Sequence, residues 1–201
     1  MALNHNRVAK YLSLIAMTIF TVIGIVNKEI TVFYILYLFW CDEFLRTFFD
    51  RWRWIRKPQE FQYRIAFLSN NKQRFFMLWV YFVFIVIIFG LVMDWKESEL
   101  VLRNFEVLFF RNGLFNYTLG TFLLREVYLL TNDIQDVEAQ FLMSNGVIIL
   151  HLSIILGIFS WFLSKEKFPL FEDYATVFSI IPFLILKLIF EIKLDNDSVN
   201  C

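Results

Sequence analysis

The stretch 141-FLMSNGVIILHLSIILGIFSWFL-163 contains no acid, lysine or arginine from its first residue to its last. A helix needs about 20 predominantly apolar residues to cross a bilayer, so this stretch predicts a membrane helix. Its one titratable group, the imidazole of His151, lies near the middle. A polar side chain at that depth is costly in hydrocarbon. His151 therefore needs either a hydrogen-bonding partner on a neighbouring helix or a functional reason to be there.

The composition extends this interpretation to the whole chain. Hydrophobic residues make up 59% of the 201 residues, and 26 residues are phenylalanine. Soluble domains are only about 45–50% apolar. Acids and bases cancel to a formal charge of +0, so no basic field attracts nucleic acid. The two cysteines, Cys41 and Cys201, form neither a disulfide framework nor a metal set, and we expect no metal and no cofactor.

Further apolar segments predict an all-α polytopic membrane helix bundle with about six transmembrane helices in a single domain, residues 1–201. Helices are favoured because they satisfy every backbone polar group in lipid without leaving an open sheet edge. The fourth segment is irregular around Asn112-Gly113: either the span begins only after Gly113, or the helix is broken there and lines a polar space. The predicted spans lie near 9–26, 30–49, 74–93, 105–130, 141–163 and 174–192.

The orientation follows from the lysines and arginines. The polar stretch between the second and third spans, residues 50–73, is rich in both, whereas the links near 94–97 and 165–167 are mixed in sign. Basic loops stay in the cytoplasm. The sequence therefore predicts a cytoplasmic basic loop at 50–73, with the N-terminus and the C-terminus on the same side.

Aromatic and basic residues alternate at the start of this loop. Tryptophan rings favour the headgroup level of a bilayer and guanidinium groups favour anionic lipid, which predicts a lipid-interface anchor. Farther along, Phe61, Ile65 and Leu68 recur at the spacing of a short amphipathic helix that lies in the interface. The anchor residues are Arg51, Trp52, Arg53 and Trp54.

Several charged residues fall inside the predicted spans, where each costs about 2.5–3.5 kcal/mol near the bilayer centre. Counting about 1.5 Å per residue from the cytoplasmic ends puts Glu43 and Lys187 at similar depth, so an ion pair between their helices is possible. Either these charges neutralise one another and lock helix packing, or they form a functional site. The candidate buried polar cluster comprises His151, Asp42, Glu43, Lys187 and Glu191.

Three short motifs resemble domain-of-unknown-function family 6498, a family of multi-pass prokaryotic membrane proteins. They are Phe39-Trp40-Cys41-Asp42, the stretch LHLSIILG at 150–157, and the stretch LKLIFE at 186–191. The chain departs from the family pattern at Asp42, where glutamate is usual, and at Glu191, where aspartate is usual. The resemblance implies a prokaryotic cytoplasmic membrane location and singles out His151 and Lys187, but it implies no established activity.

Three functions are open on these observations, and the absence of a known catalytic motif favours a protein that is not an enzyme. The first is a structural or accessory membrane subunit, whose partner is another membrane subunit or a second copy of the chain. The second is a small proton- or ion-coupled transporter or channel component that uses the buried His/acid/Lys cluster. The third is a membrane-embedded enzyme that acts on a lipid-like substrate with His151 as its base.

Overall fold

The computed structural model describes residues 2–27, 29–56, 61–132, 144–166 and 180–190, and every regular element in these ranges is a helix. The all-α prediction is confirmed for this part of the chain. Side chains are described for all of these residues except 2–7, 61–66 and 160–166. The elements are α1 (Ala2–Val26), α2 (Val32–Arg56), α3 (Phe61–Phe84), a π-helix η1 (Ile85–Val92), α4 (Ser98–Leu108), α5 (Gly113–Thr131), α6 (Asn145–Glu166) and a further helix at 180–190.

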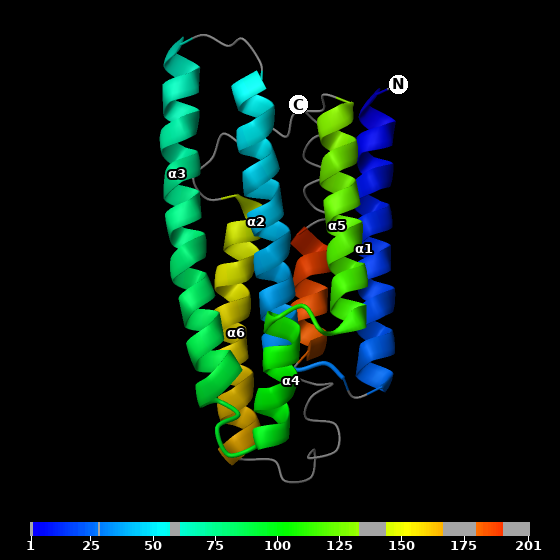
Figure 1. Cartoon of the computed structure of the whole chain (residues 1–201), viewed down its shortest axis with the longest axis vertical. Helices are drawn as coiled ribbons and strands as arrows, with labels where there is room; N and C mark the ends of the chain where they lie inside the picture. The colour runs from blue at the N-terminus through cyan, green and yellow to red at the C-terminus, as the bar shows by residue number, and fades with distance from the viewer. Residues whose placement is uncertain (1, 28, 57–60, 133–143, 167–179, 191–201) are drawn as a thin grey trace.

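Helix α2 is the central helix of the bundle (Figure 1). It packs against α3 and η1 on one side, α5 on another and α6 behind, while α1 packs mainly on α5. Every side chain from Phe33 to Phe39 is buried. A helix that is apolar all round is buried all round, and this run explains why α2 occupies the middle.

The outer helices turn large apolar side chains outward. On α3, the side chains of Phe76 and Trp79 are 71% and 68% exposed, and α1, α5, α6 and the 180–190 helix each expose a row of aliphatic residues. Two helical segments, Val8–Val26 and Phe67–Val92, are long and apolar enough to cross a membrane. Exposed apolar surface on this scale is unusual for a soluble monomer.

The predicted basic loop at 50–73 is wrong. Helix α2 continues to Arg56 and α3 already begins at Phe61, so both helices extend through most of that range. The prediction of helix around 61–68 is confirmed, but this segment is the first part of α3 and not a separate short helix. The rings of Trp54 and Phe67 stack with centroids 4.4 Å apart. The two helices thus continue to pack on each other beyond the predicted ends of the spans.

The predicted fourth span, 105–130, is two helices. Helix α4 ends at Leu108, the backbone turns through Phe110 with a φ of 57°, and α5 begins at Gly113. The Asn112 side chain accepts a hydrogen bond from the backbone N–H of Phe115 at 2.9 Å and caps α5. The helical segment is therefore broken between Leu108 and Gly113, and a new helix begins at Gly113 itself.

Two backbone carbonyl groups of the π-helix η1 accept hydrogen bonds from a side chain of α4. The buried Asn104 amide donates to the carbonyl oxygens of Phe89 and Gly90, each at 3.4 Å, and to a carboxylate oxygen of Asp94 at 3.0 Å. Its own oxygen accepts the Thr31 hydroxyl at 2.7 Å. Asn104 therefore fixes α4 against η1 and the start of α2.

Candidate functional site

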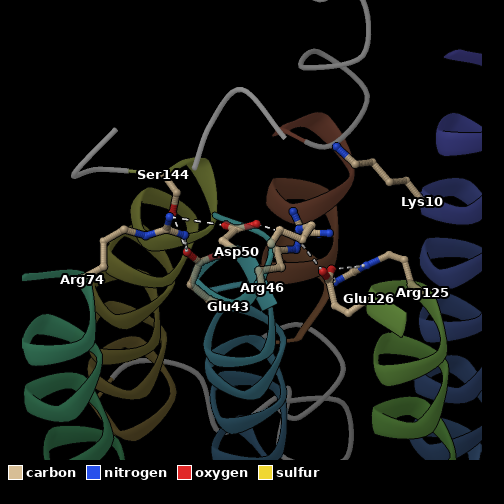
Figure 2. Close-up of a pocket in the computed structure, with 9 residues that line it drawn as sticks. Lys10, Glu43, Arg46, Asp50, Arg74, Arg125, Glu126 and Ser144 are labelled. Carbon is tan, nitrogen blue, oxygen red and sulfur yellow. Dashed lines mark hydrogen bonds and ion pairs between the residues drawn. The ribbon is translucent and has the colours of Figure 1, made fainter. Parts of the chain in front are cut away.

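Acids and bases gather in one layer inside the bundle (Figure 2). The layer lies where the C-terminal halves of α2 and α5 meet the middle of α3, the N-terminus of α6 and the 180–190 helix. We call it the charged layer. Its charged members are Asp42, Glu43, Arg46, Asp50, Arg53, Arg74, Arg125, Glu126 and Lys187, and most of them are buried.

Asp42 joins three helices. Its side chain on α2 is 1% exposed, and its Oδ1 accepts from Nη2 of Arg125 on α5 at 2.6 Å. Its Oδ2 accepts from Nζ of Lys187 on the 180–190 helix, also at 2.6 Å. Arg46, one turn along α2, lies 3.4 Å from the same carboxylate. One buried acid thus contacts bases from two other helices and one from its own.

Glu43 joins α2 to two further helices. Its Oε1 accepts from Nη2 of Arg74 on α3 at 2.7 Å and from the Ser144 hydroxyl at 2.5 Å. Ser144 also caps α6, because its Oγ accepts the backbone N–H of Val147 at 3.2 Å. The carboxylate therefore lies at the N-terminus of α6, where the helix dipole favours a negative charge.

Gly146 makes this close approach possible. A Cβ atom at this position would lie 1.7 Å from Oε2 of Glu43 and 2.6 Å from its Cδ. Only glycine, which has no Cβ, lets the first turn of α6 reach the carboxylate. The glycine is therefore required by the position of Glu43.

Further pairs complete the layer. Nη2 of Arg53 donates to Asp50 on the same helix and to Glu126 on α5, the latter at 3.1 Å. Glu126 also accepts from its neighbour Arg125 at 2.9 Å, and Nη1 of Arg74 lies 3.6 Å from Asp50. Acids and bases thus alternate from α3 through α2 to α5. Such alternation offsets part of the desolvation cost of burying each charge.

The space between these side chains is small. About 10 Å³ is open to the centres of water molecules, which is room for about one water. The lining residues are Lys10, Glu43, Arg46, Asp50, Arg53, Arg74, Arg125, Glu126 and Ser144. In the part of the chain that the structure describes, this site has no room for an organic substrate.

The structure brings together three of the five residues predicted for the cluster. Asp42 and Glu43 lie in the charged layer with Lys187, and Lys187 pairs with Asp42. His151 lies elsewhere: its ring is exposed, and its Nδ1 is 3.1 Å from the hydroxyl of Tyr81 on α3. The prediction that placed His151 in the cluster was therefore wrong, because its ring is exposed and contacts Tyr81 instead of the charged layer. Glu191 lies outside the described residues.

The lipid-interface anchor divides between two faces of α2. Arg53 and Trp54 are only 4% and 5% exposed, so their assignment to the interface was wrong. Arg51 and Trp52 are exposed, and the Arg56 guanidinium lies 5.0 Å from the centre of the Trp52 ring. Successive residues on a helix differ in direction by about 100°, so four consecutive side chains cannot share one face.

Several members of the layer were missed from the sequence. Arg125 and Glu126 stood inside a predicted span, which is itself a signal of a buried pair. Asp50 and Arg53 were assigned to the loop, and Arg74 to the edge of the third span. All five are buried. No group of three or more His, Cys, Asp or Glu side chains among the described residues is arranged to hold a metal ion.

His151→Ala is expected to change the free energy of unfolding by less than about 1 kcal/mol, because it removes one exposed hydrogen bond. The matched variant is Leu150→Ala, one residue away and fully buried, which is expected to cost about 2–5 kcal/mol. Denaturant unfolding of the purified protein in detergent measures both. Equal costs for the two variants would show that the imidazole is packed inside the bundle.

Comparison of the chain with family models, with curated proteins and with solved structures finds no match. The functional argument therefore rests on the geometry of the charged layer and on the distribution of apolar surface.

Proposed function

We propose that this chain is a multi-pass integral membrane protein that serves as a structural or accessory subunit of a prokaryotic cytoplasmic membrane. About six of its helices cross the bilayer, with both termini in the cytoplasm. The observation that carries the proposal is the distribution of side chains: ionised groups are buried and paired between helices, while large apolar groups face outward.

Lipid is the solvent that fits this distribution. Exposed rows of aliphatic and aromatic side chains need no further cover in hydrocarbon, and charged groups in a membrane helix face the interior of the bundle. Helix α2 carries the most charge, but it is central and meets other helices on most sides. With 25 residues it is also long enough, at about 1.5 Å per residue, to cross the hydrocarbon. The resemblance to family 6498 supports the prokaryotic location.

The small size of the space in the charged layer favours a structural role over transport or catalysis. A transport path or a catalytic site for a lipid-like substrate needs a cavity, whereas the space in the layer fits about one water. His151, the residue proposed as a proton relay or a base, lies outside the layer and pairs with Tyr81. The charges are accounted for by interhelical pairing, which fixes how the helices pack.

Labelling with a thiol reagent tests the membrane proposal. Single cysteines at Arg56, near the end of α2, and at Lys96, in the exposed turn between η1 and α4, are introduced after both native cysteines are replaced by serine. In intact bacterial cells, a membrane-impermeant maleimide is expected to label Lys96→Cys but not Arg56→Cys. Inverted membrane vesicles are expected to give the opposite pattern. Equal labelling of both from one side would contradict the topology.

A flux assay separates the structural role from transport. The purified protein in proteoliposomes is expected to leave the proton permeability of the vesicles unchanged between pH 5 and pH 8, a range of about one to two units on either side of the ordinary histidine pKa. A proton flux that depends on the protein and disappears in Asp42→Asn would favour the transporter instead.

A further inference from the structure

His151 is a polar residue on the outward-facing side of α6. It lies about 9 Å from the start of the helix at Asn145 and about 22 Å from its end at Glu166, and it is exposed. The imidazole therefore faces hydrocarbon on the membrane location proposed above, on which this inference rests. A polar group at this depth is costly, and lipid chains offer it no hydrogen bond.

One nitrogen of the His151 ring has a hydrogen-bonding partner. Nδ1 lies 3.1 Å from the hydroxyl oxygen of Tyr81 on α3, and the centroids of the two rings are 6.0 Å apart. The other nitrogen, Nε2, makes no hydrogen bond to any of the described residues. In a neutral imidazole one nitrogen donates and the other accepts, so Nε2 can pair with a group of either kind. A polar group from another molecule in the bilayer would complete it.

The outward-facing side of α6 also has the spacing of a helix that pairs with another helix. Successive members of this side lie three, four and three residues apart, which is the average repeat of 3.5 residues found where two helices pack side by side. A single polar residue in such a repeat fixes the register and the number of helices. We call these residues the α6 stripe, and they are Ile148, His151, Ile155 and Ile158.

We infer that a second copy of this chain packs on the α6 stripe, with a hydrogen bond between the two His151 rings. Two copies inserted in the same orientation are related by a two-fold axis along the membrane normal, so equivalent residues lie at the same depth. At its own depth, each imidazole therefore meets the imidazole of the second copy. Nε2 of one ring donates and Nε2 of the other accepts, so the stripe is complementary to itself.

Cysteine cross-linking in the membrane tests the pairing. Ile155→Cys is made in the variant that lacks both native cysteines, and Ile19→Cys on α1 is the matched control, since the two isoleucines are 53% and 52% exposed. Equivalent residues of the stripe meet each other in a parallel pair. Oxidation is therefore expected to give a disulfide-linked dimer for Ile155→Cys and a monomer for Ile19→Cys. Equal cross-linking of the two variants, or none in Ile155→Cys, would overturn the inference.

Counting subunits by single-molecule photobleaching in liposomes of neutral lipid tests the role of His151. His151→Leu suits hydrocarbon, and it is expected to raise the dimer dissociation constant in the bilayer about three- to tenfold, the usual effect of an interhelical hydrogen bond in a membrane. His151→Asn keeps a donor and an acceptor and is expected to stay close to the wild type. An unchanged dissociation constant in His151→Leu would contradict the hydrogen bond. A wild-type protein that stays monomeric at every protein-to-lipid ratio would overturn the dimer.

Two outcomes separate this inference from its alternatives. Cross-linking of Ile155→Cys to a different membrane protein, without self-linking, would assign the stripe to another subunit and overturn the second copy. The thiol labelling of Lys96→Cys and Arg56→Cys does not depend on pairing. A monomer that keeps the expected labelling would therefore contradict the dimer alone, whereas loss of the labelling pattern would contradict the membrane topology.

Discussion

Asp42→Asn is expected to lower the free energy of unfolding by about 3–5 kcal/mol, the usual cost of removing one partner of a buried ion pair. The amide is close in size to the carboxylate, so the loss comes from charge. Arg125 and Lys187, each 2.6 Å from the carboxylate, would lose this counter-charge while remaining buried. Reversible denaturant unfolding in detergent micelles, followed by circular dichroism, measures the loss.

The control for Asp42→Asn is Glu97→Gln. Glu97 lies in the exposed turn before α4, and its side chain makes no capping hydrogen bond. This variant removes the same charge from the surface and is expected to stay within about 0.5 kcal/mol of the wild type. A loss in Asp42→Asn no larger than that of the control would mean that water reaches the carboxylate and screens it.

Gly146→Ala is expected to be comparably destabilising, although it adds a single methyl group. The new Cβ would lie 1.7 Å from Oε2 of Glu43, so either the carboxylate or the first turn of α6 must move. Movement of Glu43 would break its bonds to Arg74 and Ser144 and leave the guanidinium with only the more distant Asp50, at 3.6 Å. We expect a loss of about 3–5 kcal/mol, as for other broken buried pairs.

Gly120→Ala is the matched control for this change. Gly120 lies inside α5, and a Cβ atom there would meet no atom within 4 Å. Alanine is a better helix former than glycine by about 1 kcal/mol, so this variant is expected to be neutral or more stable than the wild type. If Gly146→Ala behaved like Gly120→Ala, the close approach of α6 to Glu43 would be wrong.

The sequence alone predicted the helices and identified charged residues that would be costly to bury without partners. Long apolar runs predicted an all-helical chain, and charges inside such runs marked Asp42, Glu43 and Lys187 as residues in need of partners. Their depth along α2 and the 180–190 helix allowed an interhelical pair, and Asp42 and Lys187 form one. These inferences depend on length and composition, which a single sequence contains.

Other parts of the layer depended on information that a sequence of this kind does not contain. Ending the second span at residue 49 turned Asp50 and Arg53 into loop residues, because a span length assumes that lipid surrounds the helix. The face of α2 that carries Asp50 and Arg53 packs against other helices, so these charges can be buried beyond the predicted end of the span. The sequence also could not predict whether His151 faces the core, because α6 is apolar on all sides and has no distinct polar face.

The central claim is that the charges of the layer are paired with one another across helices inside the bundle. A double-mutant cycle on Asp42 and Lys187 tests it most directly, with Asp42→Asn, Lys187→Met and the double variant unfolded under identical conditions. We expect the double variant to be more stable than the sum of the single losses predicts, with a coupling of at least about 1 kcal/mol, as for residues in direct contact. Losses that add to within about 0.5 kcal/mol would show that the two side chains do not interact, and would contradict the claim.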